Sequence, residues 1–332
     1  MLIEAFTQAK DPSAPQANED RLVILPGLAF AVIDGATARN GSRYDGMLSG
    51  QYAAVTVKAA LERILSAPDA PLGDGLAIVR AVTDALAAAY RRHGMLERAF
   101  HERENRFSAT MALVTLHDGV ADVTLVGDSG IRIGGKVVQV EKDLDLITAT
   151  LRQQAWSVIA ETTRDPVLME KVARQVTWHG TSQAPEPLAP CLDAPKLARI
   201  EALAVAANER RLPHVPRKDI ETLVRGGIVN AQGGFQNEPG ECLGYSCMDG
   251  YAVPETLIHR EQLPLSGLET IELFSDGYFA PGVGFGVASW EEAFADVERE
   301  DPSKTGRYIS VKGSVGGVFA DDRTYLGVRL DP

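Results

Sequence analysis

The sequence has few cysteines, no long apolar run and no excess of positive charge. Three cysteines occur in 332 residues, Cys191, Cys242 and Cys247. A set that is odd in number and sparse does not form a disulfide framework, and its spacing does not match C-x-x-C. No apolar stretch reaches the roughly 20 residues that a membrane span needs. The formal charge of −12 disfavours nonspecific binding to nucleic acid or to anionic membranes.

Other common signals are also missing. The N-terminal segment, residues 1–6, has no basic stretch followed by an apolar core, so it does not resemble a signal peptide. We therefore expect a cytoplasmic protein with reduced thiols, binding neither nucleic acid nor membrane. No G-x-G-x-x-G follows an early strand, which argues against a dinucleotide-binding sheet.

Apolar periodicity predicts an irregular succession of strands and helices rather than strict alternation. Four strands at 110–116, 120–126, 131–133 and 137–140 are predicted to form one meander. The remaining predicted strands are 2–7, 21–25, 28–33, 258–262, 270–274 and 325–330, and the predicted helices are 46–66, 74–92, 145–176, 196–210 and 290–299.

This order predicts an α+β fold with two mostly antiparallel sheets flanked by helices. Residues 142–265 differ in character from the rest, with prolines and glycine pairs that break the pattern into short pieces. Acidic motifs lie on both sides of this stretch. We therefore interpret residues 1–332 as a single domain, elaborated by an insertion or flap at about 142–265.

Five carboxylate-bearing segments are the most informative feature of the chain, and four of them adjoin predicted strands. They are Asn18-Glu19-Asp20, Val32-Ile33-Asp34-Gly35, Val126-Gly127-Asp128-Ser129, Phe274-Ser275-Asp276-Gly277 and Ala320-Asp321-Asp322. Each of them alone is typical of an ordinary turn or a solvated loop. Acids at the ends of distant strands converge only if the strands pack together, and their repulsion then requires cations.

Taken together and in this order, the segments resemble the metal-dependent protein phosphatase family of the PP2C type. That family carries N-E-D, then F-x-V-x-D-G, V-G-D-S, S-D-G after a strand, and a closing D-[ND]-x-[ST]. The matching segments here are 18–20, 30–35, 126–129, 275–277 and 321–324, and residues 108–110 resemble the family's G-T-T strand. The resemblance covers residues 18–330.

The resemblance implies a four-layer α-β-β-α sandwich with two Mn²⁺ or Mg²⁺ ions at one end of the sheets. Asp34 would bridge the two ions and serve in catalysis. The implied roles of the other residues are as follows: Asp276 and Asp321 would hold the first ion, Glu19 and the carbonyl of Gly35 the second, Asp128 and Asp276 a third and weaker ion, and Asp20 would orient a metal-bound water.

The chemistry of this set agrees with those metals. Glu19, Asp34, Asp276 and Asp321 bring four negative charges, which two divalent ions offset. Ligands that offer only oxygen favour Mg²⁺ or Mn²⁺ over Zn²⁺. Water between two such ions is activated for in-line attack on phosphorus, so no nucleophilic side chain is required.

The substrate side departs from the family pattern. Family members often carry an arginine four residues before the glutamate of N-E-D, where it clamps the substrate phosphate, and Pro15 takes that position here. Arg39 and Arg43, just past Asp34-Gly35, are the best-placed substitutes in the sequence. The alternative for both is a solvated loop, and the sequence alone favours neither.

These observations predict an enzyme that hydrolyses phosphoserine or phosphothreonine in a phosphorylated protein. Two alternatives stay open: a phosphatase for a small phosphate ester, and a catalytically weak, phosphatase-like module that binds a partner. The missing arginine and the altered flap motivate the first alternative, and the divergent substrate side as a whole motivates the second. The sequence does not set the oligomeric state.

Overall fold

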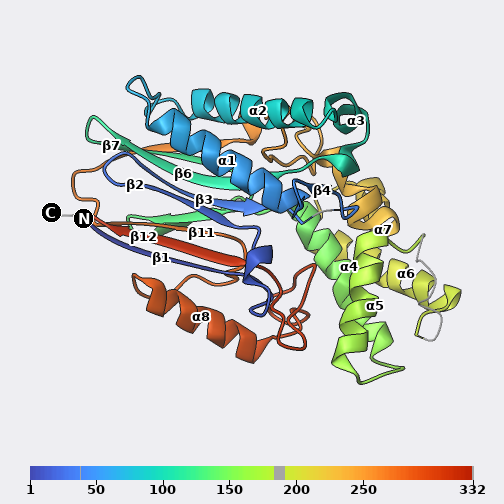
Figure 1. The fold of residues 1–332 in the computed structure, drawn as a ribbon. Helices are drawn as coiled ribbons and strands as arrows, with labels where there is room; N and C mark the ends of the chain where they lie inside the picture. The colour runs from blue at the N-terminus through green and yellow to red at the C-terminus, as the bar shows by residue number, and fades with distance from the viewer. Residues whose placement is uncertain (38, 183–190, 331–332) are drawn as a thin grey trace. The chain divides into compact units, whose positions relative to one another are not determined.

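Two five-stranded antiparallel sheets frame the part of the chain that carries the acidic motifs (Figure 1). The computed structural model describes residues 1–37, 39–182 and 191–330. These residues divide into two units: residues 1–37, 39–141, 245–295 and 321–330 belong to unit 1, and residues 142–182, 191–244 and 296–320 belong to unit 2. Each unit is described by itself, and the organisation of the chain as a single domain stays a prediction.

The first sheet of unit 1 has the order β1-β12-β11-β8-β9 and the second the order β10-β7-β6-β3-β2. A two-stranded ribbon, β4-β5, accompanies them. The strands are β1 (Leu2–Gln8), β2 (Arg21–Leu25), β3 (Ala29–Gly35), β4 (Arg43–Tyr44), β5 (Met47–Leu48), β6 (Ala109–His117), β7 (Val120–Val126), β8 (Gly130–Ile133), β9 (Lys136–Val138), β10 (His259–Pro264), β11 (Thr270–Phe274) and β12 (Arg323–Arg329).

Helices cover the outer face of each sheet. Helices α1 (Ser49–Leu65) and α2 (Gly75–Arg92) pack on the second sheet, and α3 (Leu96–His101) follows them. The start of α8 (Val287–Glu300) covers the first sheet, where Trp290 packs on Phe274 and Tyr325. The predicted arrangement of two antiparallel sheets flanked by helices is confirmed.

Strand β3 is buried on both faces, and its alternation sets the direction of Asp34. Ala31 and Ile33 belong to the core under α1 and α2. Phe30 and Val32 belong to the core between the two sheets. Because successive side chains of a strand point to opposite faces, Asp34 continues the row of Phe30 and Val32. The end of this strand therefore directs a carboxylate toward the other sheet.

The predicted four-stranded meander is wrong. β6 and β7 pair in the second sheet, whereas β8 and β9 pair in the first. Gly127 adopts a positive φ of 81° between β7 and β8, and the chain passes there from one sheet to the other. Hydrophobic alternation reports that a strand is half buried but does not report which sheet it joins.

Unit 2 contains four helices among its described residues: α4 (Asp143–Ile159), α5 (Pro166–His179), α6 (Ala194–Arg211) and α7 (Arg217–Asn230). The single helical stretch predicted at 145–176 is wrong in one respect, because Asp165 caps a new helix that begins at Pro166. Helix α7 was not predicted. In the sequence, the Gly226-Gly227 pair indicates a loop. In the structure, Gly227 instead forms a kink within α7, with a φ of 64°.

None of the helices in the described part of the chain combines the length and the apolar content that a membrane span requires.

Candidate metal centre

Three aspartates from distant segments converge in unit 1. Asp34, Asp128 and Asp276 each offer a carboxylate oxygen, and these oxygens lie within 4.8 Å of one another. Asp34 comes from the end of β3, Asp128 from the crossing between β7 and β8, and Asp276 from the segment after β11. The cluster is therefore built from both sheets. Three carboxylates at this separation repel one another unless a cation lies among them.

Local hydrogen bonds hold the crossing that carries Asp128. The Gly127 amide donates to Ser246 Oγ at 3.0 Å, and the Ser129 hydroxyl pairs with Thr110 Oγ1 at 2.6 Å. A Cβ added to Gly127 would lie 2.5 Å from a methyl group of Thr110. Only glycine combines this positive φ with this close approach. The V-G-D-S segment is thus a rigid support for its aspartate.

Glu19 and Asp20 are buried at the start of β2, and each is 2% exposed. Glu19 Oε2 accepts from Lys10 Nζ at 3.0 Å and from Thr37 Oγ1 at 3.3 Å. Asp20 Oδ2 accepts from Ser275 Oγ at 2.8 Å. The second oxygens, Glu19 Oε1 and Asp20 Oδ1, have no hydrogen-bond partner. Two buried acceptors in adjacent residues are therefore left for a ligand or water.

The pKa of Asp20 is raised to about 7. Burial is the largest cause, and the negative charges of Asp322 and Asp276 add to it, while hydrogen bonds from Ser275 and Thr324 oppose it. Burial and the two neighbouring negative charges both penalise the ionised carboxylate of Asp20. A cation bound nearby would reverse the sign of this field.

Lys10 is the feature of this region that the sequence did not reveal. Its ammonium lies 3.0 Å from Glu19 Oε2, 3.7 Å from Asp321 Oδ1 and 3.5 Å from Asp322 Oδ2. Burial would lower the pKa of Lys10, but the charges of Asp321, Glu19 and Asp322 outweigh burial and raise it. Knowledge of how β1 pairs with β12 would have predicted this contact. Gln8 pairs with Arg323, so the residues just after β1 meet those just before β12.

Asp321 and Asp322 differ in their surroundings. The carboxylate of Asp322 accepts from the backbone amides of Lys10 at 2.6 Å and Glu19 at 2.9 Å, which joins the start of β2 to β12. The side chain of Asp321 is 25% exposed. Glu19 and Asp321 thus both lie within 4 Å of the Lys10 ammonium.

Gly35 lies in a tightly packed stretch of backbone. A Cβ at this position would contact the carbonyl of Gly50 and come within 2.9 Å of the Glu19 carbonyl. A Cβ on Gly50 would come within 2.6 Å of Glu19 Oε1. A side chain is therefore excluded at Gly35, and its carbonyl as a metal ligand stays a prediction.

The two arginines named as substrate ligands have protein partners in unit 1. Arg39 donates to the hydroxyl of Tyr245 at 3.1 Å. Arg43 is exposed and donates to the carbonyl of Gly46 at 2.8 Å. The role of either in binding phosphate stays a prediction.

The donor set fits a hard divalent cation. The cluster of Asp34, Asp128 and Asp276 offers carboxylate oxygen and no sulfur or imidazole, which is the chemistry that Mg²⁺ and Mn²⁺ prefer. The buried oxygens of Glu19 and Asp20 without partners are further acceptors in unit 1. The assignment of individual ligands stays a prediction.

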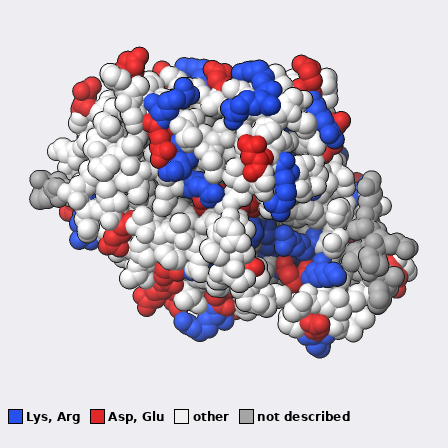
Figure 2. All heavy atoms as spheres, in the orientation of Figure 1, with Lys and Arg blue, Asp and Glu red and all other residues white. Residues whose placement is uncertain are grey.

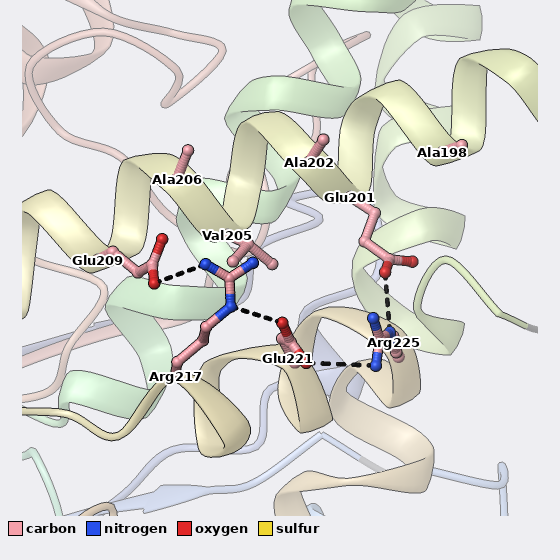
Figure 3. Close-up of a pocket in the computed structure, with 9 residues that line it drawn as sticks. All are labelled: Ala198, Glu201, Ala202, Val205, Ala206, Glu209, Arg217, Glu221 and Arg225. Carbon is pink, nitrogen blue, oxygen red and sulfur yellow. Dashed lines mark hydrogen bonds and ion pairs between the residues drawn. The ribbon is translucent and has the colours of Figure 1, made fainter.

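Unit 2 has a surface pocket of about 330 Å³ between α6 and α7 (Figure 3). Alanines and Val205 of α6 line it, together with five charged residues that pair with one another. Arg217 donates to Glu209 and Glu221, and Arg225 donates to Glu201 and Glu221, at 2.8 to 3.3 Å. Because these charges already satisfy one another, the pocket indicates no ligand.

Figure 2 shows positive and negative side chains interspersed over the face in view. The acidic excess of the chain therefore does not gather into a single patch on this face.

No family model and no curated protein sequence matches this chain. Solved structures with a similar fold include a Mycobacterium tuberculosis serine/threonine phosphatase, PstP/Ppp (14% identity, TM-score 0.47, 100% of both chains covered). They also include Stp1 from Staphylococcus aureus (12% identity, TM-score 0.48, 100% of this chain and 96% of that one). The PstP catalytic domain in complex with two manganese ions is a third (16% identity, TM-score 0.47, 99% of this chain and 98% of that one). These three structures are of serine/threonine phosphatases.

Proposed function

We propose that this chain is a metal-dependent phosphatase of the PP2C type that hydrolyses phosphoserine and phosphothreonine in proteins. The observation that carries the proposal is the convergence of Asp34, Asp128 and Asp276 from three distant segments. Such an arrangement is costly without a cation, so a fold that maintains it is adapted to bind one. The order of the motifs along the chain supports the choice of phosphoryl transfer.

The residues of this site would have separate roles in the reaction. Asp34, Asp128 and Asp276 would hold divalent metal, and the motif resemblance adds Glu19, Asp321 and the Gly35 carbonyl as ligands where a further ion binds. Asp20 is fixed by Ser275 through Oδ2 and has Oδ1 without a hydrogen-bond partner, so Oδ1 would accept a hydrogen bond from water and orient it. When bound, the ions would supply an activated water and stabilise charge on the phosphoryl oxygens.

The test is Mn²⁺-dependent hydrolysis of phosphoserine and phosphothreonine peptides by the purified chain. Asp34→Asn and Asp276→Asn should each reduce turnover by at least a thousandfold, because each removes a charged ligand. Asp118→Asn is the matched control, since Asp118 is a fully exposed hairpin residue with a φ of 45°, a conformation that asparagine tolerates.

Three outcomes would overturn the proposal. Near wild-type rates in both cluster variants would show that these carboxylates do not act in the reaction. Absence of turnover with Mn²⁺ demonstrably bound would favour a binding module. Hydrolysis of small phosphate esters at rates well above those for phosphopeptides would move the substrate to the alternative class.

A further inference from the structure

Two of the carboxylates assigned to metal binding contact a lysine. Asp34, Asp128 and Asp276 converge on one another. Glu19 and Asp321 share the ammonium of Lys10 with Asp322. A lysine therefore lies where the resemblance would place ligands of two different ions.

The backbone fixes Lys10 in this place. Its amide donates to Asp322 Oδ1 at 2.6 Å, and the other oxygen of the same carboxylate holds the amide of Glu19 at 2.9 Å. Lys10 and Glu19 are thus brought together by one buried side chain, which is 3% exposed. The contact between the ammonium and Glu19 is not that of a freely placed surface side chain, because Asp322 holds the backbone amides of both residues.

The side chain of Lys10 is itself largely buried, with 24% of it exposed. The ammonium donates a hydrogen bond to Glu19 Oε2, and its positive charge also attracts the carboxylates of Asp321 and Asp322. A divalent ion and an ammonium repel each other at contact distance, so both cannot share these oxygens without displacement. Occupancy by Lys10 and occupancy by a second ion are therefore alternatives.

We infer that Lys10 serves as a built-in cation that replaces one of the two divalent ions, so that the chain binds a single ion tightly at Asp34, Asp128 and Asp276. This inference rests on the proposed function, because it concerns the same site. It assigns a role to Lys10, whose ammonium contacts the proposed ligands Glu19 and Asp321.

The test counts ions and does not depend on turnover. Equilibrium dialysis of the full chain against Mn²⁺, with the metal quantified by plasma spectrometry, gives the number of ions and their dissociation constants. The native chain should bind one tight ion, with any second ion at least tenfold weaker. Lys10→Met should bind the second ion at least tenfold more tightly than the native chain does.

Lys136→Met is the matched control. It removes the same charge from an exposed lysine, which lies 3.5 Å from Glu261, and should leave the native stoichiometry unchanged. Circular dichroism checks that each variant folds. If Lys10→Met does not fold, the count for the native chain still decides.

The inference is overturned if the native chain binds two ions of similar affinity, or if a folded Lys10→Met variant binds Mn²⁺ as the native chain does. Two tight ions together with phosphatase activity would remove this inference and leave the proposed function standing. A chain that binds no Mn²⁺ would overturn both.

Discussion

Two acidic side chains in unit 1 are buried, and each has one oxygen that forms no hydrogen bond. Glu19 Oε1 and Asp20 Oδ1 are buried acceptors without hydrogen-bond partners, and such groups cost about 1–3 kcal/mol each. Their neighbouring oxygens, Glu19 Oε2 and Asp20 Oδ2, do accept hydrogen bonds. We attribute the two acceptors without partners to a site that is completed by a ligand and water.

The two candidate phosphate-binding arginines differ in burial and in hydrogen bonding, and this difference gives a prediction. Arg39 is half-buried and oriented by the hydroxyl of Tyr245, whereas Arg43 is exposed. Arg39→Ala should raise KM for a phosphopeptide about tenfold or more, with a smaller effect on kcat, since hydrogen bonds to charged groups contribute about 1.5–3 kcal/mol. Steady-state kinetics measures both parameters.

Arg43→Ala is the control for that experiment and should leave both parameters within about twofold. A larger effect for Arg43→Ala than for Arg39→Ala would assign the phosphate to the other arginine. No effect in either variant would mean that neither side chain binds the substrate phosphate.

At the scale of elements, strands were predicted well and their partners were not. The strand at 270–274 was predicted with its observed bounds, because an apolar run ends at Ser275-Asp276-Gly277. The crossing at Gly127 was missed, since the alternation within β7 and β8 is the same in one sheet or in two. Convergence of Asp128 with Asp34 and Asp276 follows from that crossing, and local sequence does not encode it.

Lys10 was missed for a related reason. Its contacts with Glu19 and Asp322 depend on the pairing of β1 with β12, which are more than 300 residues apart in sequence. The carboxylates were found because their motifs are distinctive. A single lysine after a strand belongs to no distinctive motif, so only the pairing of β1 with β12 could have predicted its contacts.

The crossing itself can be tested with two glycines of similar conformation. Gly127→Ala should destabilise the chain by more than 1 kcal/mol and weaken Mn²⁺ binding, because the added Cβ meets Thr110 and displaces Asp128. Gly119 has a φ of 76° but open space around it. Gly119→Ala should therefore cost stability through backbone strain alone and leave Mn²⁺ affinity unchanged.

Denaturant unfolding and Mn²⁺ titration measure the two quantities separately. Equal loss of Mn²⁺ affinity in both variants would contradict the view that Gly127 positions the metal cluster. A Gly127→Ala variant with native stability and native affinity would do so as well.

For the molecule as a whole, ion binding should appear as stability. A ligand that binds only the folded state at 100 times its Kd adds about 2.7 kcal/mol, so saturating Mn²⁺ should raise Tm by several degrees. EDTA should reverse the shift. Differential scanning fluorimetry with and without Mn²⁺ measures it.

The variant Asp34→Asn separates site binding from a general effect of the ion. It should lose most of the shift in Tm while folding normally, because a negative charge is removed from a repulsive cluster. An unchanged Tm with Mn²⁺ but a raised Tm with Zn²⁺ would indicate a different site.

The most direct test of the central claim is a crystal structure with Mn²⁺ and anomalous diffraction data. We predict an anomalous peak in direct contact with carboxylate oxygens of Asp34 and Asp276, with Asp128 beside it. It would be contradicted by Mn²⁺ bound elsewhere in the chain with these three aspartates making no contact to it.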